Sequence, residues 1–166
     1  MKIKRVESIV KNSRHINIRW RDGVQWIGDG AGMYPLNGFP LISEDNVFKL
    51  LDIPADKKEK FTYTEGEWPE SYDLSDTSPN DVPAERSPIH IIENGVMMLP
   101  LHTPDGVLFI NVKYLHPFSD EENGVELYVR KVGNQNLIAV KAGFFLVGLI
   151  APVEFNRYDE LKKICN

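Results

Sequence analysis

The 166-residue sequence contains a single cysteine, Cys165, and no long run of apolar residues. One thiol cannot form an internal disulfide, so the fold does not depend on one, as expected in a reducing compartment. The longest apolar run, 144–153, is interrupted by Gly148 and Pro152 and is too short to span a bilayer. The charged N-terminus is not followed by an apolar signal core. We therefore expect an untargeted, cytoplasmic protein that does not associate with membranes.

Motifs of metal sites and active sites are also missing. None of the four histidines is spaced as in HxxxH or HExxH, and one cysteine cannot build a cysteine-based zinc site. Neither a serine nucleophile elbow nor a Cys/His pair is visible. The acidic run 120–122 precedes Asn123-Gly124 and is interpreted as a solvated turn. The sequence predicts a non-catalytic protein without metal or cofactor. An enzyme with a site assembled from scattered residues stays open as an alternative.

One glycine-rich segment, Gly28-Asp-Gly-Ala-Gly32, follows an expected strand. A phosphate-binding P-loop needs Lys and Ser/Thr after its last glycine, whereas Met33 and Tyr34 stand there. A dinucleotide fingerprint needs a helix at this point, and Pro35 opposes one. We interpret the segment as a turn.

Charge is distributed unevenly along the chain. The formal net charge is −5, which argues against a protein that coats nucleic acid but does not exclude a local basic face. Residues 1–21 contain seven Lys/Arg and one acid, and this basic stretch is either a phosphate-contacting face or a solvated one. Residues 64–88 contain seven acids, one base and four prolines. Such a composition is typical of a long solvated loop.

The first half of the chain, residues 1–63, combines helical and strand patterns. We expect a helix at 3–10, then a hairpin of the strands 16–20 and 24–27, and then a strand at 31–36. Two short helices are expected after it, at 43–51 and 55–61. Asp22-Gly23 is the expected hairpin turn. Trp20 and Trp26 flank this turn, and we expect them to be near neighbours on one face and part of the core.

The second half, residues 89–155, has a similar order. Its expected strands are 89–92, 96–101, 107–110, 125–132, 137–140 and 144–151. A short helix or turn is expected between the third and fourth of them, at 111–118. Each half thus runs strand, turn, strand, Asp-Gly, strand, helix, a weak repeat of roughly 70 to 75 residues.

These patterns define the expected architecture. We predict one α+β domain over 1–166, built from two pseudo-repeated β-β-β-α halves whose antiparallel sheets pack on short helices. The acidic, proline-rich loop 64–88 separates the halves, and a tail at 156–166 carries a short helix over 158–164.

A family resemblance sharpens this expectation. Phe109-Ile-Asn-Val-Lys-Tyr-Leu115 resembles the opening of the last half-domain of bacterial DNA sliding clamps. The runs 125–129 and 137–140 resemble the strands that follow in that family, and 144–155, FFLVGLIAPVEF, resembles its closing strand. Residues 24–30 are similar to an earlier strand and turn of the clamp.

The resemblance implies a clamp-like fold with basic helices toward DNA and an apolar groove near the last strand for peptides of replication partners. The residues that it implies are Lys57, Lys58, Lys60 and Lys113 facing DNA, and Pro152, Val153 and Phe155 at the groove.

Two non-catalytic functions follow. The first is a clamp-like accessory protein of DNA metabolism, such as one encoded by a mobile element, that binds DNA, a replication partner or both. The second is a protein-interaction or assembly module that binds no nucleic acid. The second is motivated by the strand 144–151, whose large apolar residues on both faces need to be covered.

Overall fold

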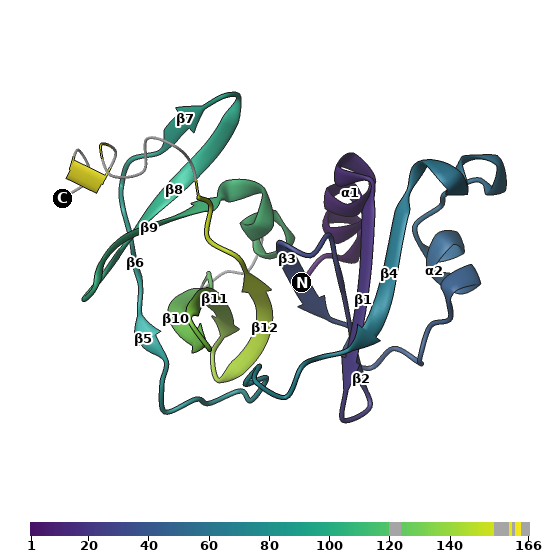
Figure 1. Cartoon of the computed structure of the whole chain (residues 1–166), viewed down its shortest axis with the longest axis horizontal. Coiled ribbons are helices and arrows are strands. Elements are labelled where there is room, and N and C mark those ends of the chain that lie inside the picture. Colours follow the sequence, from purple (N-terminus) through teal and green to yellow (C-terminus); the bar gives the residue numbers. More distant parts are fainter. Residues whose placement is uncertain (120–123, 155–159, 161, 164–166) are drawn as a thin grey trace. The chain divides into compact units, whose positions relative to one another are not determined.

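The computed structural model describes residues 1–119, 124–154, 160, 162 and 163. It is a mixed α+β structure with many strands and few helices. The chain divides into two compact units, shown in Figure 1: an N-terminal unit, 2–70, and a C-terminal unit, 71–166 together with Met1. The division falls inside the predicted acidic loop.

The N-terminal unit contains one sheet with the strand order β4-β1-β2-β3. Its elements are α1 (Ile3–Ser13), β1 (His15–Arg21), β2 (Val24–Gly28), β3 (Gly32–Pro35), α2 (Glu44–Leu50), the 3₁₀-helix η1 (Ala55–Lys60) and β4 (Thr62–Glu67). The strands β1, β2 and β3 form an antiparallel meander, whereas β4 pairs with β1 in parallel. The sheet is therefore mixed, which corrects the expectation of purely antiparallel sheets.

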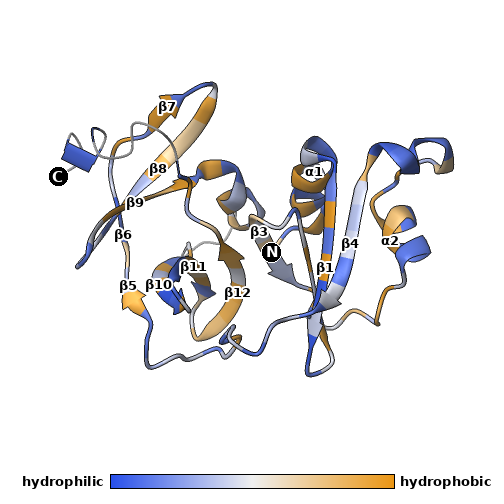
Figure 2. Cartoon of the chain, viewed as in Figure 1, coloured by the Kyte–Doolittle hydropathy of each residue, from blue (hydrophilic) through white to orange (hydrophobic). Residues whose placement is uncertain are grey.

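Helix α1 forms because its apolar residues recur at helical spacing. Val6, Ile9 and Val10 lie on one side and are buried, and the helix packs against β1 and β2. The other side is polar, so α1 shows an apolar and a polar stripe in Figure 2. The helix ends at Arg14, whose φ of 56° is left-handed. The predicted helix 3–10 is confirmed and extends three residues further.

The hairpin of β1 and β2 turns at Asp22-Gly23, as predicted. Both residues have positive φ, 52° and 77°, which matches the twist of a two-residue hairpin loop. The two-residue loop sets Trp20 opposite Gln25 and Trp26 opposite Arg19. Because side chains alternate along a strand, the two tryptophans lie on opposite faces, and the expectation that they are neighbours is wrong.

Trp26 instead meets Trp68, which comes from the end of β4. The two ring centroids are 5.7 Å apart at 83°, an edge-to-face contact, and both side chains are buried. The backbone N–H of Trp68 donates to the carbonyl of Trp20. This contact packs the residue after β4 against β2, just before the N-terminal unit ends at Glu70.

Strand β4 corrects the predicted loop 64–88, because its residues 64–67 belong to a strand. β4 is an edge strand in which no residue is fully buried, so it carries polar residues and gives no apolar pattern. Its pairing with β1 joins residues about 47 positions apart, for example Ile16 with Tyr63. Short-range sequence patterns contain no information about such a partner.

The C-terminal unit has two groups of strands. One sheet has the order β12-β11-β10-β5; in the other, β6 and β7 pair along one side of β8 and β9 pairs along its other side. The elements are β5 (Val82–Pro83), β6 (Glu85–Arg86), β7 (Ile91–Glu93), β8 (Val96–Thr103), β9 (Gly106–Asn111), the 3₁₀-helix η2 (Val112–Phe118), β10 (Glu126–Val132), β11 (Gln135–Ala142) and β12 (Phe145–Ile150).

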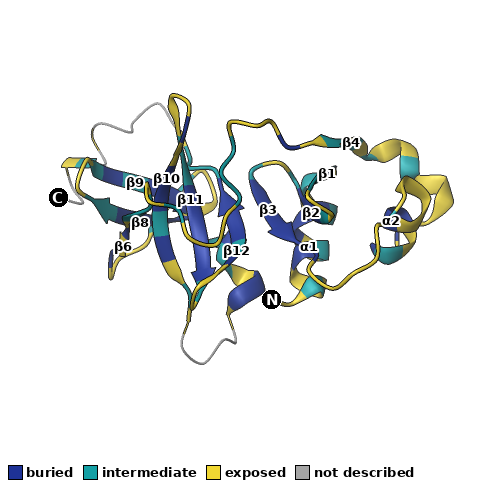
Figure 3. Cartoon of the chain, turned by 90° about the horizontal axis from the view of Figure 1, so that it is seen from below, coloured by how far each residue is buried: buried dark blue, intermediate teal, exposed yellow. Residues whose placement is uncertain are grey.

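The predicted strands and turns of this unit are confirmed within a few residues. Asn94-Gly95 turns the chain between β7 and β8 with φ of 51° and 76°. Most of β11 and β12 is buried, as Figure 3 shows for the C-terminal unit. The exception is the start of β12, where Phe145 is 65% exposed beside Phe144 at 82%.

The acidic segment after residue 70 is fastened to the strands of the C-terminal unit. Arg130 on β10 donates from Nε and Nη2 to the two carboxylate oxygens of Asp81, at 2.7 and 2.8 Å. Its Nη1 donates to the carbonyls of Asp73 and Ser75 at 2.7 and 2.9 Å. Lys141 Nζ on β11 lies 2.6 Å from Asp81 Oδ2. Residues 71–81 thus form a loop without helix or strand, as predicted, but several of its residues are bound to the strands.

The acidic residues of the segment 71–81 have a structural role. The side chains of Arg130 and Asp81 are only 1% and 4% exposed, and a buried guanidinium needs a carboxylate partner. Asp76 adds a second attachment, because its Oδ1 accepts the backbone N–H of Leu146 at 2.9 Å. The segment supplies the countercharge and the acceptors that the strands require.

Every helix in the described part of the chain is too short or too polar to cross a bilayer. The predicted acidic turn at 120–122 lies outside the described residues, as does most of the predicted tail helix 158–164, together with Phe155.

Candidate functional site

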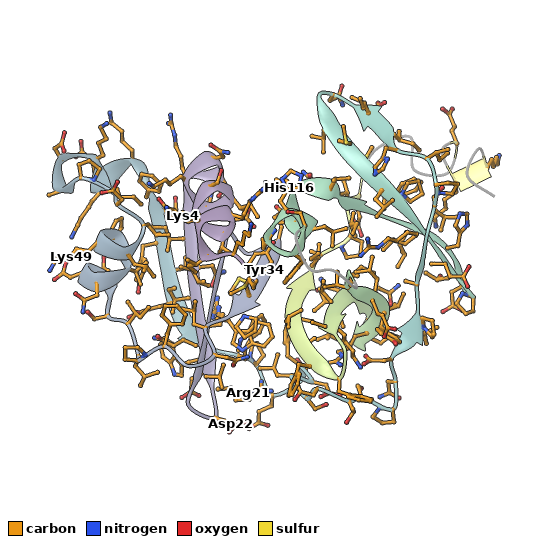
Figure 4. The ribbon with its side chains drawn as sticks, turned by 180° about the vertical axis from the view of Figure 1, so that it is seen from behind. Lys4, Arg21, Asp22, Tyr34, Lys49 and His116 are labelled. Atoms are coloured by element: carbon orange, nitrogen blue, oxygen red, sulfur yellow. The ribbon has the colours of Figure 1, made fainter. Side chains whose placement is uncertain are left out.

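The exposed side of α1 carries a concentration of positive charge. Lys4 and Arg5 are exposed there, and Figure 4 shows Lys4 on this helix. Lys11 is half-buried and bound to Glu7, with Nζ 2.6 Å from Oε1. Burial of Val6, Ile9 and Val10 against the sheet forces these charged residues outward. The helix therefore presents cations to the solvent as a consequence of its amphipathic pattern.

The C-terminal end of α1 lies next to η1. The backbone N–H of Thr62 donates to the carbonyl of Arg14 at 2.9 Å, so the residue after α1 touches the start of β4. Helix η1 immediately precedes β4, which brings its lysines to the same end of the unit. Parallel pairing of β1 with β4 thus joins two basic segments that are more than 40 residues apart. We call Arg14, Lys57 and Lys60 the basic surface; Lys4 and Arg5 lie in the first turn of α1, at the opposite end of that helix.

The predicted DNA-facing lysines of the first half divide into two kinds. Lys57 and Lys60 are exposed on η1. Lys58 is half-buried, because its Nζ lies 3.0 Å from Asp45 Oδ1 and 5.0 Å from the centre of the Phe48 ring. The hydrogen bond from Lys58 lowers the pKa of Asp45. Lys58 therefore joins η1 to α2, and Lys57 and Lys60 are the residues available to a ligand.

Lys113, the fourth predicted residue, lies on η2 in the C-terminal unit. Its Nζ is 4.6 Å from the centre of the Tyr114 ring, a cation–π contact, and the residue is half-buried. The side chain of Asn111 caps this helix by accepting the backbone N–H of Lys113. The sequence thus placed Lys113 on a helix correctly.

Two arginines of the basic N-terminal stretch serve the fold. Arg21 Nη2 donates to the carbonyls of Trp68, at 2.8 Å, and of Pro69, and so holds the end of β4. Arg19 donates from Nε to Asn17 and lies over Gly66, where a Cβ would stand 2.8 Å from its Nη1. These two residues are half-buried within the sheet, so they do not belong to the basic surface.

Of the predicted groove residues, Val153 lies beside β9. The backbone N–H of Val153 donates to the carbonyl of Phe109 at 2.7 Å, so the segment after β12 runs along this strand. The side chain of Val153 packs against Met98, Val107 and Phe109. Pro152 is half-buried, and Phe155 lies outside the described residues.

A small apolar face is exposed on the β7–β8 hairpin. Ile92 and Met97 are cross-strand partners and are 66% and 46% exposed, whereas Met98, on the other face, is buried. In Figure 2 hydrophobic segments of β7 and β8 flank the hydrophilic turn of this hairpin. Natural sheets rarely leave such a pair uncovered, which makes this face a candidate contact surface.

The glycine-rich segment 28–32 is a turn, as predicted. The carboxylate of Asp29 accepts the backbone N–H groups of Ala31 and Gly32 at 3.1 and 3.0 Å. A Cβ on Gly28 would lie 1.7 Å from the carbonyl oxygen of Gly32, so only glycine fits. The N–H groups that a phosphate would need are occupied. In the described parts of the chain, no three His, Cys, Asp or Glu side chains gather closely enough to hold a metal ion.

Comparison of the chain with protein-family models, with curated proteins and with solved structures yields no match. The argument for function therefore comes from the chain's own residues.

Sequence patterns alone did not join the end of α1 to η1. Each segment was visible as basic, since Arg14 belongs to the basic stretch 1–21 and Lys57 and Lys60 belong to the predicted helix 55–61. What was missing was the β1–β4 pairing, which brings η1 to the end of α1. The sequence indicated two basic segments, and the pairing makes them one surface.

Proposed function

We propose that this chain is a non-catalytic, clamp-like accessory protein of DNA metabolism that binds DNA phosphates through the basic surface. The observation that carries the proposal is the grouping of the exposed Arg14, at the C-terminal end of α1, with the exposed Lys57 and Lys60 of η1. Cations that neutralise phosphates release condensed counterions, which provides affinity without base recognition. The net charge of −5 opposes wrapping of DNA around the whole chain and favours contact through one face.

The order of elements supports the clamp-like part of the proposal. In the N-terminal unit, α1 precedes the antiparallel meander β1-β2-β3, and in the C-terminal unit η2 precedes the meander β10-β11-β12. The segments that carry the family resemblance fall on η2 and these three strands in the expected order. The predicted β-β-β-α order of each half corresponds to β1-β2-β3 followed by α2 and to β7-β8-β9 followed by η2, which supports the proposal of two comparable halves.

DNA binding is tested by fluorescence anisotropy with a labelled duplex of random sequence at several salt concentrations. A surface whose cations contact about three phosphates gives a slope of log K against log salt of about −2.7. The triple variant R14N/K57Q/K60Q is expected to make this slope shallower by about 2 to 3 and to weaken binding at low salt. Asparagine is chosen at position 14 because it tolerates the left-handed backbone there.

The matched control is K49Q/K131Q/K163Q, which removes three exposed lysines elsewhere and changes the net charge equally. The control is expected to keep the wild-type slope. If both triple variants bind equally well, or if the wild type does not bind at low salt, the basic surface is not a DNA site.

A second candidate function is supported by the apolar face of the β7–β8 hairpin. Exposure of Ile92 and Met97 as a cross-strand pair favours an assembly module that contacts another protein or a second copy of itself. This candidate needs no nucleic acid, so the two functions make different predictions about salt dependence and self-association.

A further inference from the structure

A pocket of about 350 Å³ opens in the C-terminal unit. Its polar lining comes from three places in the chain: Arg86 on β6, His90 in the segment before β7, and His116 on η2. Figure 4 shows His116 projecting from this helix. The volume of the pocket lies near the lower end of the range for small-molecule sites.

Arg86 is a cation without a countercharge in the described part of the protein. Its Nη2 donates to the carbonyl of Val125 at 2.8 Å, and no carboxylate of the described residues pairs with it. The residue as a whole is exposed, but burial of its guanidinium lowers the pKa of Arg86. A guanidinium stays protonated in proteins, so this charge persists and its remaining N–H groups can serve an anion.

The two imidazoles extend this donor set. Both His90 and His116 are exposed, so they can turn toward a ligand, and each offers an N–H donor in either tautomer. The described lining contains no Asp or Glu. Three nitrogen donors without an acid among them favour an anion over a cation.

Apart from Ser87 and Ser119, the rest of the described lining carries no polar side chain. Leu99 and Phe118 are buried and form part of the wall, and Leu115 is half-buried beside them. An inorganic ion would leave this wall in contact with water. A ligand with an anionic head and an apolar or aromatic body would use both parts of the pocket.

We propose that this pocket binds a small organic phosphate monoester, with the phosphoryl group held by Arg86, His90 and His116 and the organic body against Leu99, Leu115 and Phe118. A phosphoryl group is favoured over a carboxylate because three separate nitrogen donors match three terminal oxygens. The site is independent of DNA binding by the N-terminal unit.

The inference is tested by NMR titration of the ¹⁵N-labelled full chain with phenyl phosphate. We expect a dissociation constant of about 1 mM or lower for a probe of this size, with shifts centred on the lining residues. The variant R86Q is expected to weaken binding about tenfold or more, because it removes a charged donor. The control K131Q removes one exposed charge elsewhere in the same unit and is expected to bind like the wild type.

The double variant H90Q/H116Q changes only exposed side chains, so it keeps the test usable if R86Q does not fold. It is expected to weaken phenyl phosphate binding about fivefold or more. Inorganic phosphate is expected to bind more weakly than phenyl phosphate, and equal affinities would refute the apolar part of the site.

Two further probes share the aromatic ring of phenyl phosphate. Benzoate binding as tightly as phenyl phosphate would assign a carboxylate ligand instead. Preference for phenyltrimethylammonium, which carries the opposite charge, would overturn the inference, as would equal phenyl phosphate affinity in R86Q and K131Q.

Discussion

At the scale of single residues, Arg130 does most to hold the acidic segment in place. It is fully buried, and its N–H groups donate hydrogen bonds to Asp81, Asp73 and Ser75, which lie 49 to 57 positions earlier in the chain. A buried guanidinium is tolerated only when its countercharge and hydrogen bonds are complete. Asp81 serves Arg130 and Lys141 together, so its carboxylate is the residue on which this arrangement depends.

The variant D81N tests this dependence. It keeps the size of the side chain but removes the charge opposite Arg130, and it is expected to lower the free energy of unfolding by about 3 to 5 kcal/mol. Urea denaturation followed by circular dichroism measures the change. D105N is the matched control, because Asp105 is 81% exposed and its contact with Lys131 is 3.5 Å long. The control is expected to cost less than about 1 kcal/mol, and equal losses in both variants would contradict the prediction.

At the scale of elements, the strands and turns differ in how far local patterns predict them. Hairpin turns with Asp-Gly or Asn-Gly need positive φ at both positions, and that chemistry marks them directly in the sequence. The apolar stripe of α1 is equally local. β4 escaped prediction because an edge strand needs no apolar face and its partner, β1, is far away in the chain.

The β7–β8 hairpin carries the prediction at this scale. If its exposed pair is a contact surface, the wild type is expected to self-associate as its concentration rises, and I92T/M97T to stay monomeric. Threonine keeps the β-branched preference for strands, so the free energy of unfolding is expected to change by less than about 0.5 kcal/mol. Sedimentation velocity over a range of concentrations measures the association.

The matched control is F39Q/L41Q, which removes two other exposed apolar residues, 47% and 70% exposed, from the N-terminal unit. Its association is expected to equal that of the wild type. A wild type that remains monomeric at every concentration would exclude self-association through this hairpin and leave only a foreign partner.

At the scale of the whole molecule, charge is divided between the two units. The N-terminal unit has eleven Lys/Arg and eleven Asp/Glu, whereas the remaining residues have eight and thirteen, so the net charge of −5 belongs to the C-terminal unit. A balanced unit with its cations grouped at one end is compatible with a local DNA contact. The acidic excess of the other unit includes the carboxylates bound by Arg130.

These carboxylates predict how the protein responds to acid. Burial opposes ionisation of Asp73, but hydrogen bonds from Ser75 and Ser78 and the charge of Arg130 outweigh it and lower its pKa to about 2. The pKa of Asp81 is lowered as well, because the hydrogen bonds and charges of Arg130 and Lys141 outweigh its burial. A depressed pKa in the folded state adds stability above the unfolded pKa, and this stability is lost as the pH falls through the folded pKa.

We therefore expect the urea midpoint to be steady above about pH 5 and to fall between about pH 4 and pH 2. In D73N the fall is expected to be less steep, since one of the linked protons is absent. Measurement of the midpoint at several pH values decides this, with D105N as the control that keeps the wild-type slope. A midpoint independent of pH in this window would show that these carboxylates do not stabilise the fold.

Sequence reasoning found Lys57, Lys60 and the basic stretch of α1 separately, and it placed Lys113 on a helix. It could not tell that Arg21 and Lys58 are engaged within the fold, because their partners, the carbonyl of Trp68 and the carboxylate of Asp45, lie 47 and 13 positions away. It also gave no hint of the pocket around Arg86, whose lining comes from segments more than 25 residues apart.

The amino-acid sequence by itself determined the hairpin turns, the amphipathic helix α1 and the glycine turn at 28–32, since each depends on backbone preferences and side-chain contacts within a few residues. Tertiary structure alone decided the parallel pairing of β1 with β4, the separate faces of Trp20 and Trp26, and the burial of Arg130 against Asp81. These features arise only when distant segments meet, because the entropy lost in closing a long loop is repaid by burial and hydrogen bonds that no local window contains.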